Sequence, residues 1–94
     1  MKMLPNFILY TRDNCQWCDK AKELLATVAL PICEFDVSDD TNKEILKSRG
    51  LKTVPQIWFN EPNVSDAEYI GGFDRLEVWL KNNGDRLDGR HFVR

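Results

Sequence analysis

The sequence predicts a small α/β domain, and three observations support that prediction. Apolar segments typical of strands alternate along the chain with amphipathic segments typical of helices. The length of 94 residues suits one domain with a single core. Cys15 and Cys18 stand where the first strand gives way to the first helix. Two thiols at that spacing and place are typical of dithiol-disulfide exchange.

The first expected strand covers residues 7–11 and is almost wholly apolar, as a strand buried on both faces should be. A polar loop at residues 12–14 separates it from the first expected helix. We expect that helix to pack on the sheet and to stop at Leu30-Pro31. Its apolar stripe has the spacing i, i+3, i+4 and i+7 and consists of Ala21, Leu24, Leu25 and Val28.

Residues 32–37 form the second expected strand, and Cys33 lies inside it. A lone cysteine in an apolar strand is usually a small buried hydrophobe, so we expect Cys33 to be buried. Because a helix joins this strand to the first, the two strands should be parallel, with a right-handed crossover.

The second expected helix follows a short turn. Thr41 and Glu44 match the capping-box pattern, which predicts that the helix starts there. Gly50 is expected to end the helix, and Ile45 and Leu46 should face inward.

The remaining elements are a third strand, a loop, a fourth strand and a last helix. The strands are expected at residues 56–59 and 68–70, with a connecting loop at 60–67 and Gly71-Gly72 after the fourth strand. This gives the order β-α-β-α-β-β-α.

The last expected helix starts at a second capping pattern, formed by Asp74 and Glu77, and ends at Asn82-Asn83-Gly84. Its apolar face consists of Leu76, Trp79 and Leu80. We assign residues 1–84 to the domain and 85–94 to a charged C-terminal tail. The tail residues suited to docking on the domain are Leu87, Phe92 and Val93.

The place of the two cysteines at a helix start also affects their reactivity. A free thiol with a pKa of about 8.5 is only a few per cent thiolate near pH 7, and the thiolate is the nucleophile. A helix N-terminus contributes at most ~2 kcal/mol, which lowers a pKa by ~1.5. Further lowering must come from hydrogen bonds donated by Cys18 and from cations such as Arg12 and Lys20. We predict that Cys15 attacks and that the less exposed Cys18 resolves the mixed disulfide.

Two other interpretations of the cysteine pair remain open. A structural zinc site takes four ligands, and the sequence offers only the isolated Cys33 and His91 beside the pair. In the second interpretation, the two cysteines serve only to pack the helix. Asp19, Lys20 and Lys22 count against it, because they make this end of the helix polar.

Composition narrows the range of functions. The formal net charge is −2 with both signs interspersed, so the chain has no basic patch for nucleic acid. It shows neither a signal-peptide pattern nor an apolar run long enough to span a membrane. We therefore expect a cytoplasmic protein without nucleic-acid or membrane partners, in which a disulfide is transient and catalytic.

Three motifs occur in order along the chain. They are Tyr10-Thr11-Arg12 leading to Cys18, then Thr53-Val54-Pro55-Gln56, then Gly71-Gly72-Phe73-Asp74. Together they resemble the glutaredoxins of the dithiol type, a family of the thioredoxin-like fold, and the likeness extends over residues 7–83. The resemblance implies a four-stranded mixed sheet in the order 2-1-3-4, with three helices and with the last two strands antiparallel to the first two.

The same resemblance implies an activity and partners. The enzyme would reduce protein disulfides and glutathione mixed disulfides, and glutathione would be the co-substrate that regenerates it. No metal would be required, and the chain would act as a monomer in electron transport and cell redox homeostasis. Its protein substrates would be disulfide proteins such as ribonucleotide reductase.

A glutathione site also follows from the resemblance. Val54-Pro55 would form a cis-proline loop facing Cys15, where the backbone of Val54 pairs with glutathione as an added strand would. Gly71-Gly72 would let the chain pass close to the ligand, and the start of the last helix would bind a carboxylate. The implied glutathione contacts are Arg12, Trp17, Lys52, Thr53, Val54, Pro55, Gly72, Phe73 and Asp74.

Three departures from the family pattern keep other functions open. Gln16-Trp17 replaces the usual Pro-Tyr, which should change the reduction potential of the cysteine pair. Some family members without that proline hold a two-iron, two-sulfur cluster between two subunits. Leu51 replaces a ligand-contacting arginine or glutamine, with Lys52 as its candidate substitute, and Arg75 replaces a second acidic residue. The alternatives are a redoxin recharged by thioredoxin reductase and a cluster-binding glutaredoxin.

Overall fold

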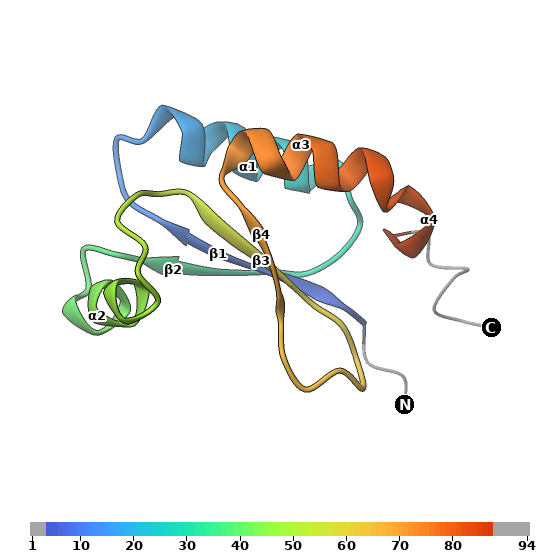
Figure 1. Cartoon of the computed structure of the whole chain (residues 1–94). Coiled ribbons are helices and arrows are strands. Elements are labelled where there is room, and N and C mark those ends of the chain that lie inside the picture. The colour runs from blue at the N-terminus through green and yellow to red at the C-terminus, as the bar shows by residue number, and fades with distance from the viewer. Residues whose placement is uncertain (1–3, 88–94) are drawn as a thin grey trace.

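A four-stranded mixed sheet forms the centre of the molecule, in a computed structural model that describes residues 4–87 (Figure 1). The strand order is β2-β1-β3-β4, which confirms the expected sheet. β1 and β2 are parallel, β3 is antiparallel to β1, and β4 is antiparallel to β3. β4 therefore runs in the direction of β1, and the expectation that both last strands oppose the first two is wrong for β4. The strands are β1 (Asn6–Thr11), β2 (Ile32–Asp36), β3 (Gln56–Asn60) and β4 (Glu68–Gly71).

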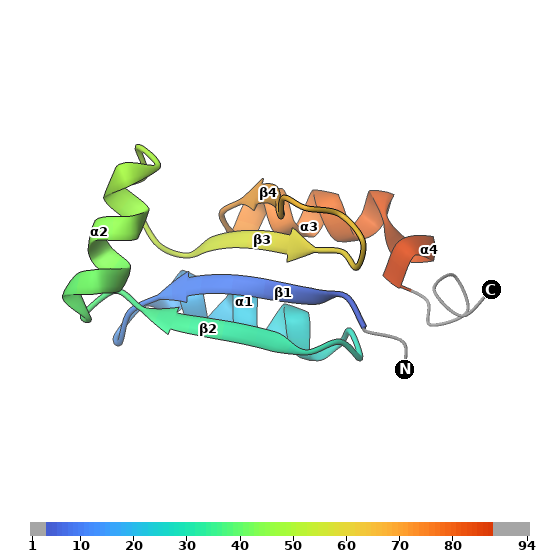
Figure 2. The same cartoon turned by 90° about the horizontal axis from the view of Figure 1, so that it is seen from below.

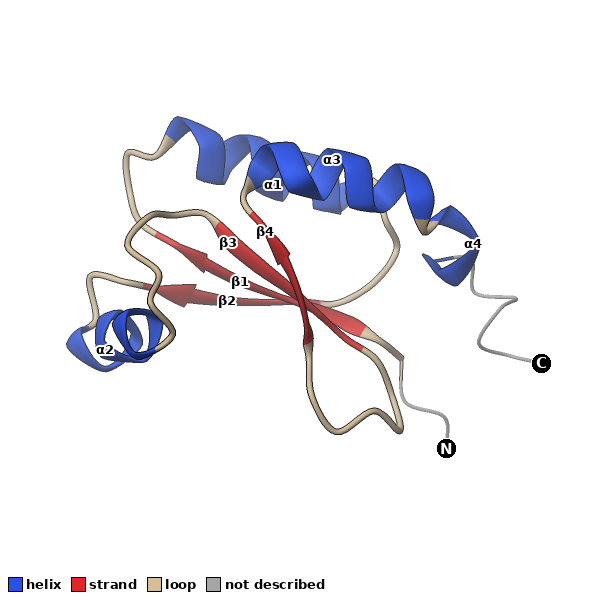
Figure 3. Cartoon of the chain, viewed as in Figure 1, coloured by secondary structure: helices blue, strands red, loops and turns tan. Residues whose placement is uncertain are grey.

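Helices lie on both faces of the sheet (Figure 3). Three of them are α1 (Gln16–Ala26), α2 (Asp40–Ser48) and α3 (Phe73–Asn82), and the one-turn α4 (Gly84–Leu87) follows. α1 and α3 cover one face, whereas α2 lies across the end of the other face where β1 ends and β3 begins (Figure 2). The start of α1, the loop before β3 and α2 thus gather at one end of the sheet. Within residues 4–87, no helix is long and apolar enough to cross a membrane.

The larger core fills the space between the sheet and the helices α1 and α3. It contains the expected apolar stripe, with Ala21 and Leu25 fully buried and Leu24 and Val28 packed at its margin. α1 ends at Ala26, earlier than expected, so Val28 lies beyond its C-cap. The apolar face of α3 closes the same core, as expected. Its buried members are Phe7, Leu9, Ala21, Leu25, Ile57, Phe59 and Leu76.

A smaller core lies on the opposite face of the sheet, beneath α2. Leu46 of α2 packs with Tyr10 and Trp58, and Ile45 lies at the margin, so the predicted inward face of α2 is confirmed. Val54, in the loop before β3, packs against this cluster. The core therefore connects α2 to the loop that approaches the cysteine pair.

Cys33 is exposed, so the expectation that it is buried is wrong. β2 forms as expected, but it is the edge strand of the sheet, and all five of its residues are exposed. An apolar strand at the edge has neighbours on one side only, and α1 and α3 pack mainly over the other strands.

The two predicted capping patterns are also wrong in detail. Asp39, not Thr41, caps α2, and its carboxylate accepts hydrogen bonds from the backbone N–H groups of Thr41 and Asn42. At α3 the N-cap is Gly72, and no side chain caps the helix, so Asp74 lies within the first turn. Before α2, several adjacent residues have capping side chains and the local backbone conformation selects one, whereas the cap of α3 is a glycine without a side chain.

The short helix α4 crosses the boundary assigned between domain and tail. Leu87 packs against the larger core, in agreement with the expectation that it docks. The guanidinium of Arg86 contacts Glu61 at 3.0 Å and Glu68 at 3.2 Å. His91, Phe92 and Val93 lie outside the described residues, and the division into domain and tail stays a prediction.

Candidate active site

Cys15 and Cys18 form a disulfide at the start of α1, with their Cα atoms 5.2 Å apart. Cys15 is the N-cap residue and has extended backbone torsions, while Cys18 lies in the first helical turn. The exposed fraction is 8% for Cys15 and 0% for Cys18. Cys18 is therefore the less exposed of the two sulfurs, as expected, and the order of attack and resolution stays a prediction.

Backbone groups surround the sulfur of Cys15. The backbone N–H of Cys18 donates to Cys15 Sγ at 3.2 Å, and this is the hydrogen bond expected to stabilise a thiolate. Asn14, immediately before, has a φ of 56°, which turns the chain into the helix. On the other side, the carbonyl oxygen of Val54 lies 3.9 Å from Cys15 Sγ. The sulfur thus lies between a helix start and the loop before β3.

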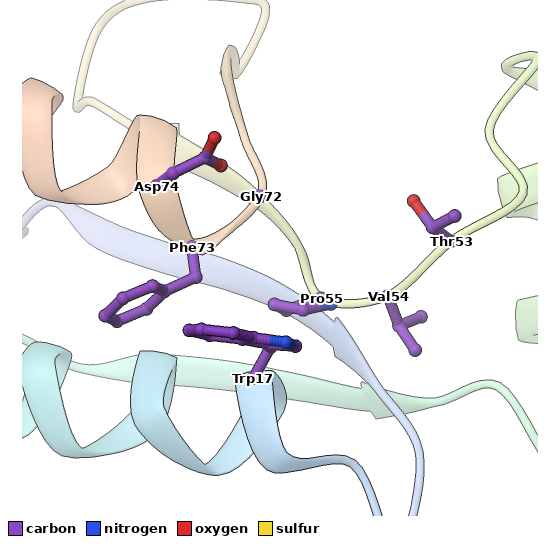
Figure 4. Close-up of a pocket in the computed structure, with 7 residues that line it drawn as sticks. All are labelled: Trp17, Thr53, Val54, Pro55, Gly72, Phe73 and Asp74. Atoms are coloured by element: carbon purple, nitrogen blue, oxygen red, sulfur yellow. The ribbon is translucent and has the colours of Figure 1, made fainter.

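A cavity of about 400 Å³ opens beside this loop (Figure 4). The Val54-Pro55 peptide bond is cis, as the family pattern implied. Trp17 of α1 and Phe73 of α3 lie side by side at one end of the cavity, with ring centroids 5.6 Å apart. Seven of the implied glutathione contacts line the cavity, namely Trp17, Thr53, Val54, Pro55, Gly72, Phe73 and Asp74.

The start of α3 supplies unpaired backbone donors to one wall of the cavity. Because no side chain caps α3, its first N–H groups are available to a ligand, and they attract an anion. Gly71 has a φ of +124°, and a Cβ there would lie 3.0 Å from Arg75 Cγ, so this position requires glycine. A Cβ at Gly72 would meet nothing closer than 3.6 Å, at the carbonyl oxygen of Pro55.

Arg12 and Lys52 lie apart from the other implied contacts. They line a second cavity, of about 500 Å³, beneath α2. Thr53 and Val54 line both cavities, so the two spaces meet at the loop before β3. Leu51, which replaces a ligand-contacting residue of the family pattern, also lines the second cavity.

A hydrogen-bonded chain behind Thr53 was not found from the sequence. The buried side chain of Gln56 donates from Nε2 to Thr53 Oγ1 at 3.0 Å, and its Oε1 accepts from the hydroxyl of Tyr69 at 2.5 Å. Gln56 belongs to the motif Thr53-Val54-Pro55-Gln56, so the sequence already indicated that it lies near the site. Tyr69 carries no such signal, because its contact depends on the pairing of β3 with β4.

A second hydrogen-bonded group connects the middle of α1 to the sheet edge. Thr11 Oγ1 donates to Glu34 at 2.6 Å, and Lys22 Nζ lies 2.9 Å from the same carboxylate oxygen. The hydrogen bond from Thr11 and then the contact with Lys22 lower the pKa of Glu34. The hydrogen bond with Glu34 in turn raises the pKa of Lys22.

Lys20 and Arg12 are the two cations expected near the sulfur of Cys15, and each has a definite place in the structure. Lys20 Nζ lies 4.6 Å from the centroid of the Trp17 ring, in a cation-π contact. Arg12 is exposed at the second cavity. Among the described residues, no group of three or more His, Cys, Asp or Glu side chains is placed to hold a metal ion.

Together, the fold and the cysteine pair define a class of protein. A disulfide at a helix start, with a cis-proline loop opposite, on a four-stranded sheet with helices on both faces, is the site of a thioredoxin-like thiol-disulfide oxidoreductase. Comparison with known proteins narrows the class to one family. A family model described as Glutaredoxin matches residues 7–63, and the chain belongs to the glutaredoxin family of disulfide oxidoreductases.

Individual relatives agree with this assignment. The chain is 35% identical over 75 residues to Glutaredoxin 3 of Escherichia coli, covering 78% of this chain and 83% of the relative. It is 40% identical over 78 residues to Glutaredoxin 1 of Rickettsia conorii, covering 79% of this chain and 71% of the relative. The solution structure of glutaredoxin from Brucella melitensis superposes with a TM-score of 0.60 at 32% identity, covering 93% of this chain and 88% of that chain.

Proposed function

We propose that the protein is a glutathione-dependent reductase of protein disulfides and glutathione mixed disulfides. The observation that carries this proposal is the 400 Å³ cavity at the cis-proline loop, which is lined by seven of the residues implied as glutathione contacts. The loop also holds the carbonyl oxygen of Val54 within 3.9 Å of Cys15 Sγ. A ligand bound in this cavity would therefore have its sulfur close to the attacking cysteine.

The chemistry of the cavity matches the groups of a glutathionyl ligand. Its γ-glutamyl end carries a carboxylate and an ammonium group, and the start of α3 offers free N–H donors together with the carboxylate of Asp74. Its cysteinyl backbone would pair with Val54 as an added strand. The glycyl carboxylate would reach the margin of the second cavity, where Arg12 and Lys52 lie.

The reaction consists of two exchanges between sulfurs. The Cys15 thiolate attacks one sulfur of the substrate disulfide, a mixed disulfide forms, and the other substrate sulfur leaves as a thiolate that takes up a proton. For a protein disulfide, the thiolate of Cys18 then attacks Cys15 Sγ, releases the second substrate thiol and forms the Cys15–Cys18 disulfide. Two molecules of glutathione reduce that disulfide and become one molecule of glutathione disulfide.

The test is reduction of a small glutathione mixed disulfide, coupled to glutathione reductase and NADPH. We expect turnover by the wild-type protein, none by Cys15→Ser, and retained turnover by Cys18→Ser, because glutathione itself can resolve the intermediate. Cys18→Ser should lose the reduction of protein disulfides, which needs both thiols. Wild-type rates in Cys15→Ser would contradict the assignment of roles.

A different outcome would distinguish the alternative function. If the wild-type protein shows no turnover with glutathione but has a disulfide that thioredoxin reductase and NADPH reduce, then glutathione dependence is wrong. The protein would then be a redoxin served by another reductase. Leu51 and Arg75 would be the first residues to examine, because they replace ligand-contacting residues of the family pattern.

We also propose a cytoplasmic setting, a monomeric enzyme and ribonucleotide reductase among the disulfide substrates. The support is indirect, and it comes from the family and from the use of the cysteines as a reversible pair. Recovery of oxidised ribonucleotide reductase activity with this protein, glutathione and glutathione reductase would test the substrate. If ribonucleotide reductase activity did not recover while the small mixed disulfide was still reduced, only ribonucleotide reductase would be rejected as a substrate.

A further inference from the structure

The second cavity carries an unusual set of charges. Four cationic side chains line it, and none of the described residues that line it is acidic. The whole chain has 13 basic and 15 acidic residues, so four cations without an acid depart from its average surface. The cations are Arg12, Lys43, Lys47 and Lys52, over an apolar floor that includes Leu46 and Leu51.

Two of these cations exceed what a glutathionyl ligand needs. Arg12 and Lys52 suffice for its glycyl carboxylate, whereas Lys43 and Lys47 belong to α2. The two lysines are four residues apart, which places them on one face of the helix. Lys47 has only a contact at 4.0 Å with the exposed Glu44, and among the described residues Lys43 has no ion pair. Both ammonium groups are therefore available to a ligand.

The cavity lies beside the loop that approaches the reactive centre. Thr53 and Val54 line this cavity as well as the 400 Å³ one, and Val54 lies beside Cys15 Sγ. An extended peptide advances by about 3.3 Å per residue. A protein chain whose cysteine reacts with Cys15, and which runs along Val54 toward α2, would bring its next two or three side chains over the lysines.

We propose that Lys43 and Lys47 bind carboxylates that flank the attacked cysteine, so that the enzyme prefers protein disulfides in acidic segments. The inference rests on the proposed function, since it takes Cys15 as the attacking thiol. Exposed ion pairs contribute modestly to binding, and salt screens them. The lysines are thus specificity determinants for macromolecular substrates and are not required for the exchange itself.

The experiment uses two symmetrical peptide disulfides and needs no glutathione. In one peptide, two glutamates precede and two follow the cysteine, and in the other, glutamines replace them. Fully reduced protein converts each peptide disulfide to two thiols and is itself oxidised to the Cys15–Cys18 disulfide. Release of peptide thiol in acid-quenched samples, measured by mass spectrometry, gives the second-order rate constant.

We expect the acidic peptide disulfide to react about three- to tenfold faster near 0.01 M salt, where charges interact over about 30 Å, and to lose that advantage near 1 M salt. Lys43→Gln and Lys47→Gln should each reduce the advantage by about twofold, the range of one exposed ion pair. Lys81→Gln is the matched control, because this exposed lysine belongs to α3 and is absent from both cavities at the loop.

Three results would overturn the inference. Equal rates for the two peptides at low salt would show that the protein has no acidic preference. A full preference in the double variant Lys43→Gln/Lys47→Gln would remove these lysines as its cause, as would an equal loss in Lys81→Gln. Failure to reduce either peptide would instead contradict the proposed function, and the inference would be rejected with it.

Discussion

The hydroxyl of Thr53 is oriented by Gln56, which does not itself line the cavity. Thr53 Oγ1 accepts a hydrogen bond from Gln56, and Gln56 in turn accepts one from Tyr69. Because the Thr53 oxygen serves as an acceptor here, its own O–H is directed elsewhere and can donate to a ligand. Gln56 is 5% exposed, so its amide has little water to replace a lost partner.

Tyr69→Phe should weaken this chain while leaving the ring contact with Trp58 intact, at 5.1 Å between centroids. We expect the free energy of unfolding to fall by about 1 kcal/mol. The KM for a glutathione mixed disulfide should rise a few-fold with kcat unchanged, because Thr53 lines the cavity while the groups in contact with Cys15 Sγ come from Cys18 and Val54.

A double-mutant cycle with Thr53→Val checks the connection. If the three side chains act together, the effects of Tyr69→Phe and Thr53→Val on KM will be less than additive. Strictly additive effects would show that the two hydroxyls act independently and that the chain does not orient Thr53.

At the scale of single residues, the chemistry-bearing positions were predictable and their surroundings were not. The spacing of Cys15 and Cys18 was sufficient to identify the reactive pair, because the chemistry requires that spacing. Cys33 was misjudged, since burial in a strand depends on whether a helix covers it, and that is a property of the tertiary fold. Tyr69 was missed for the same reason, because only strand pairing brings it to Gln56.

At the scale of elements, the two incorrect caps have different causes. At α3 the N-cap is Gly72, a position set by the backbone conformation and not by a capping side chain. At α2 the cause is a choice between neighbours. Residues 38–41 all have side chains that can cap a helix, and sequence pattern alone cannot rank neighbours. Asp39 has the extended torsions of an N-cap, with φ −75° and ψ 126°. The existence, order and inward faces of the helices were predictable, because they depend on an apolar period that many residues share.

Asp39→Ala should destabilise the protein by about 1 kcal/mol, since two backbone N–H groups of α2 lose their acceptor. Thr41→Ala is the control, and it should cost less, because Thr41 receives no capping role in the structure. Urea denaturation at neutral pH measures both. A larger loss in Thr41→Ala than in Asp39→Ala would show that the capping box forms after all.

At the scale of the whole molecule, Glu34 joins three elements. Its carboxylate accepts from Thr11 of β1 and contacts Lys22 of α1, while its own backbone belongs to β2. The middle of α1, the helix that begins at the cysteine pair, is therefore tied to the edge of the sheet. The connection depends on charge, because the hydrogen bond from Thr11 and the contact with Lys22 both favour the ionised carboxylate.

The pH dependence of stability should reveal this connection. The folded-state pKa of Glu34 lies below its ordinary value of 4.5, so its stabilising effect is complete above that pH and is lost as the pH falls through the lower folded-state pKa. Glu34→Gln should cost less than about 1 kcal/mol at pH 7, since both partners are 41% exposed and solvent screens them.

The same variant should lose less stability than the wild type between pH 5 and about pH 3, because it no longer has this group to protonate. Urea midpoints across that range check the prediction, with Glu23→Gln, an exposed change on α1, as the control. Parallel pH profiles for wild type and Glu34→Gln would contradict it.

The layout of the two cavities could be predicted only in part. Seven implied contacts do gather at one cavity, because the loop before β3 and the starts of α1 and α3 meet beside Cys15. Arg12 and Lys52 lie at the second cavity, whose wall is α2. The sequence predicts α2 but not that it crosses the end of the strands (Figure 2). Nothing in the sequence therefore marked Lys43 and Lys47 as residues of a cavity.

The exposure of Cys33 has a practical consequence for counting thiols. The chain has three cysteines, and in the oxidised protein only Cys33 keeps a free sulfhydryl. An alkylating reagent should therefore add one group to the oxidised protein and three to the reduced protein. A redox titration followed by mass spectrometry would therefore start from one adduct per chain. A fluorophore attached to Cys33 would label the edge of the sheet and leave Cys15 and Cys18 unmodified.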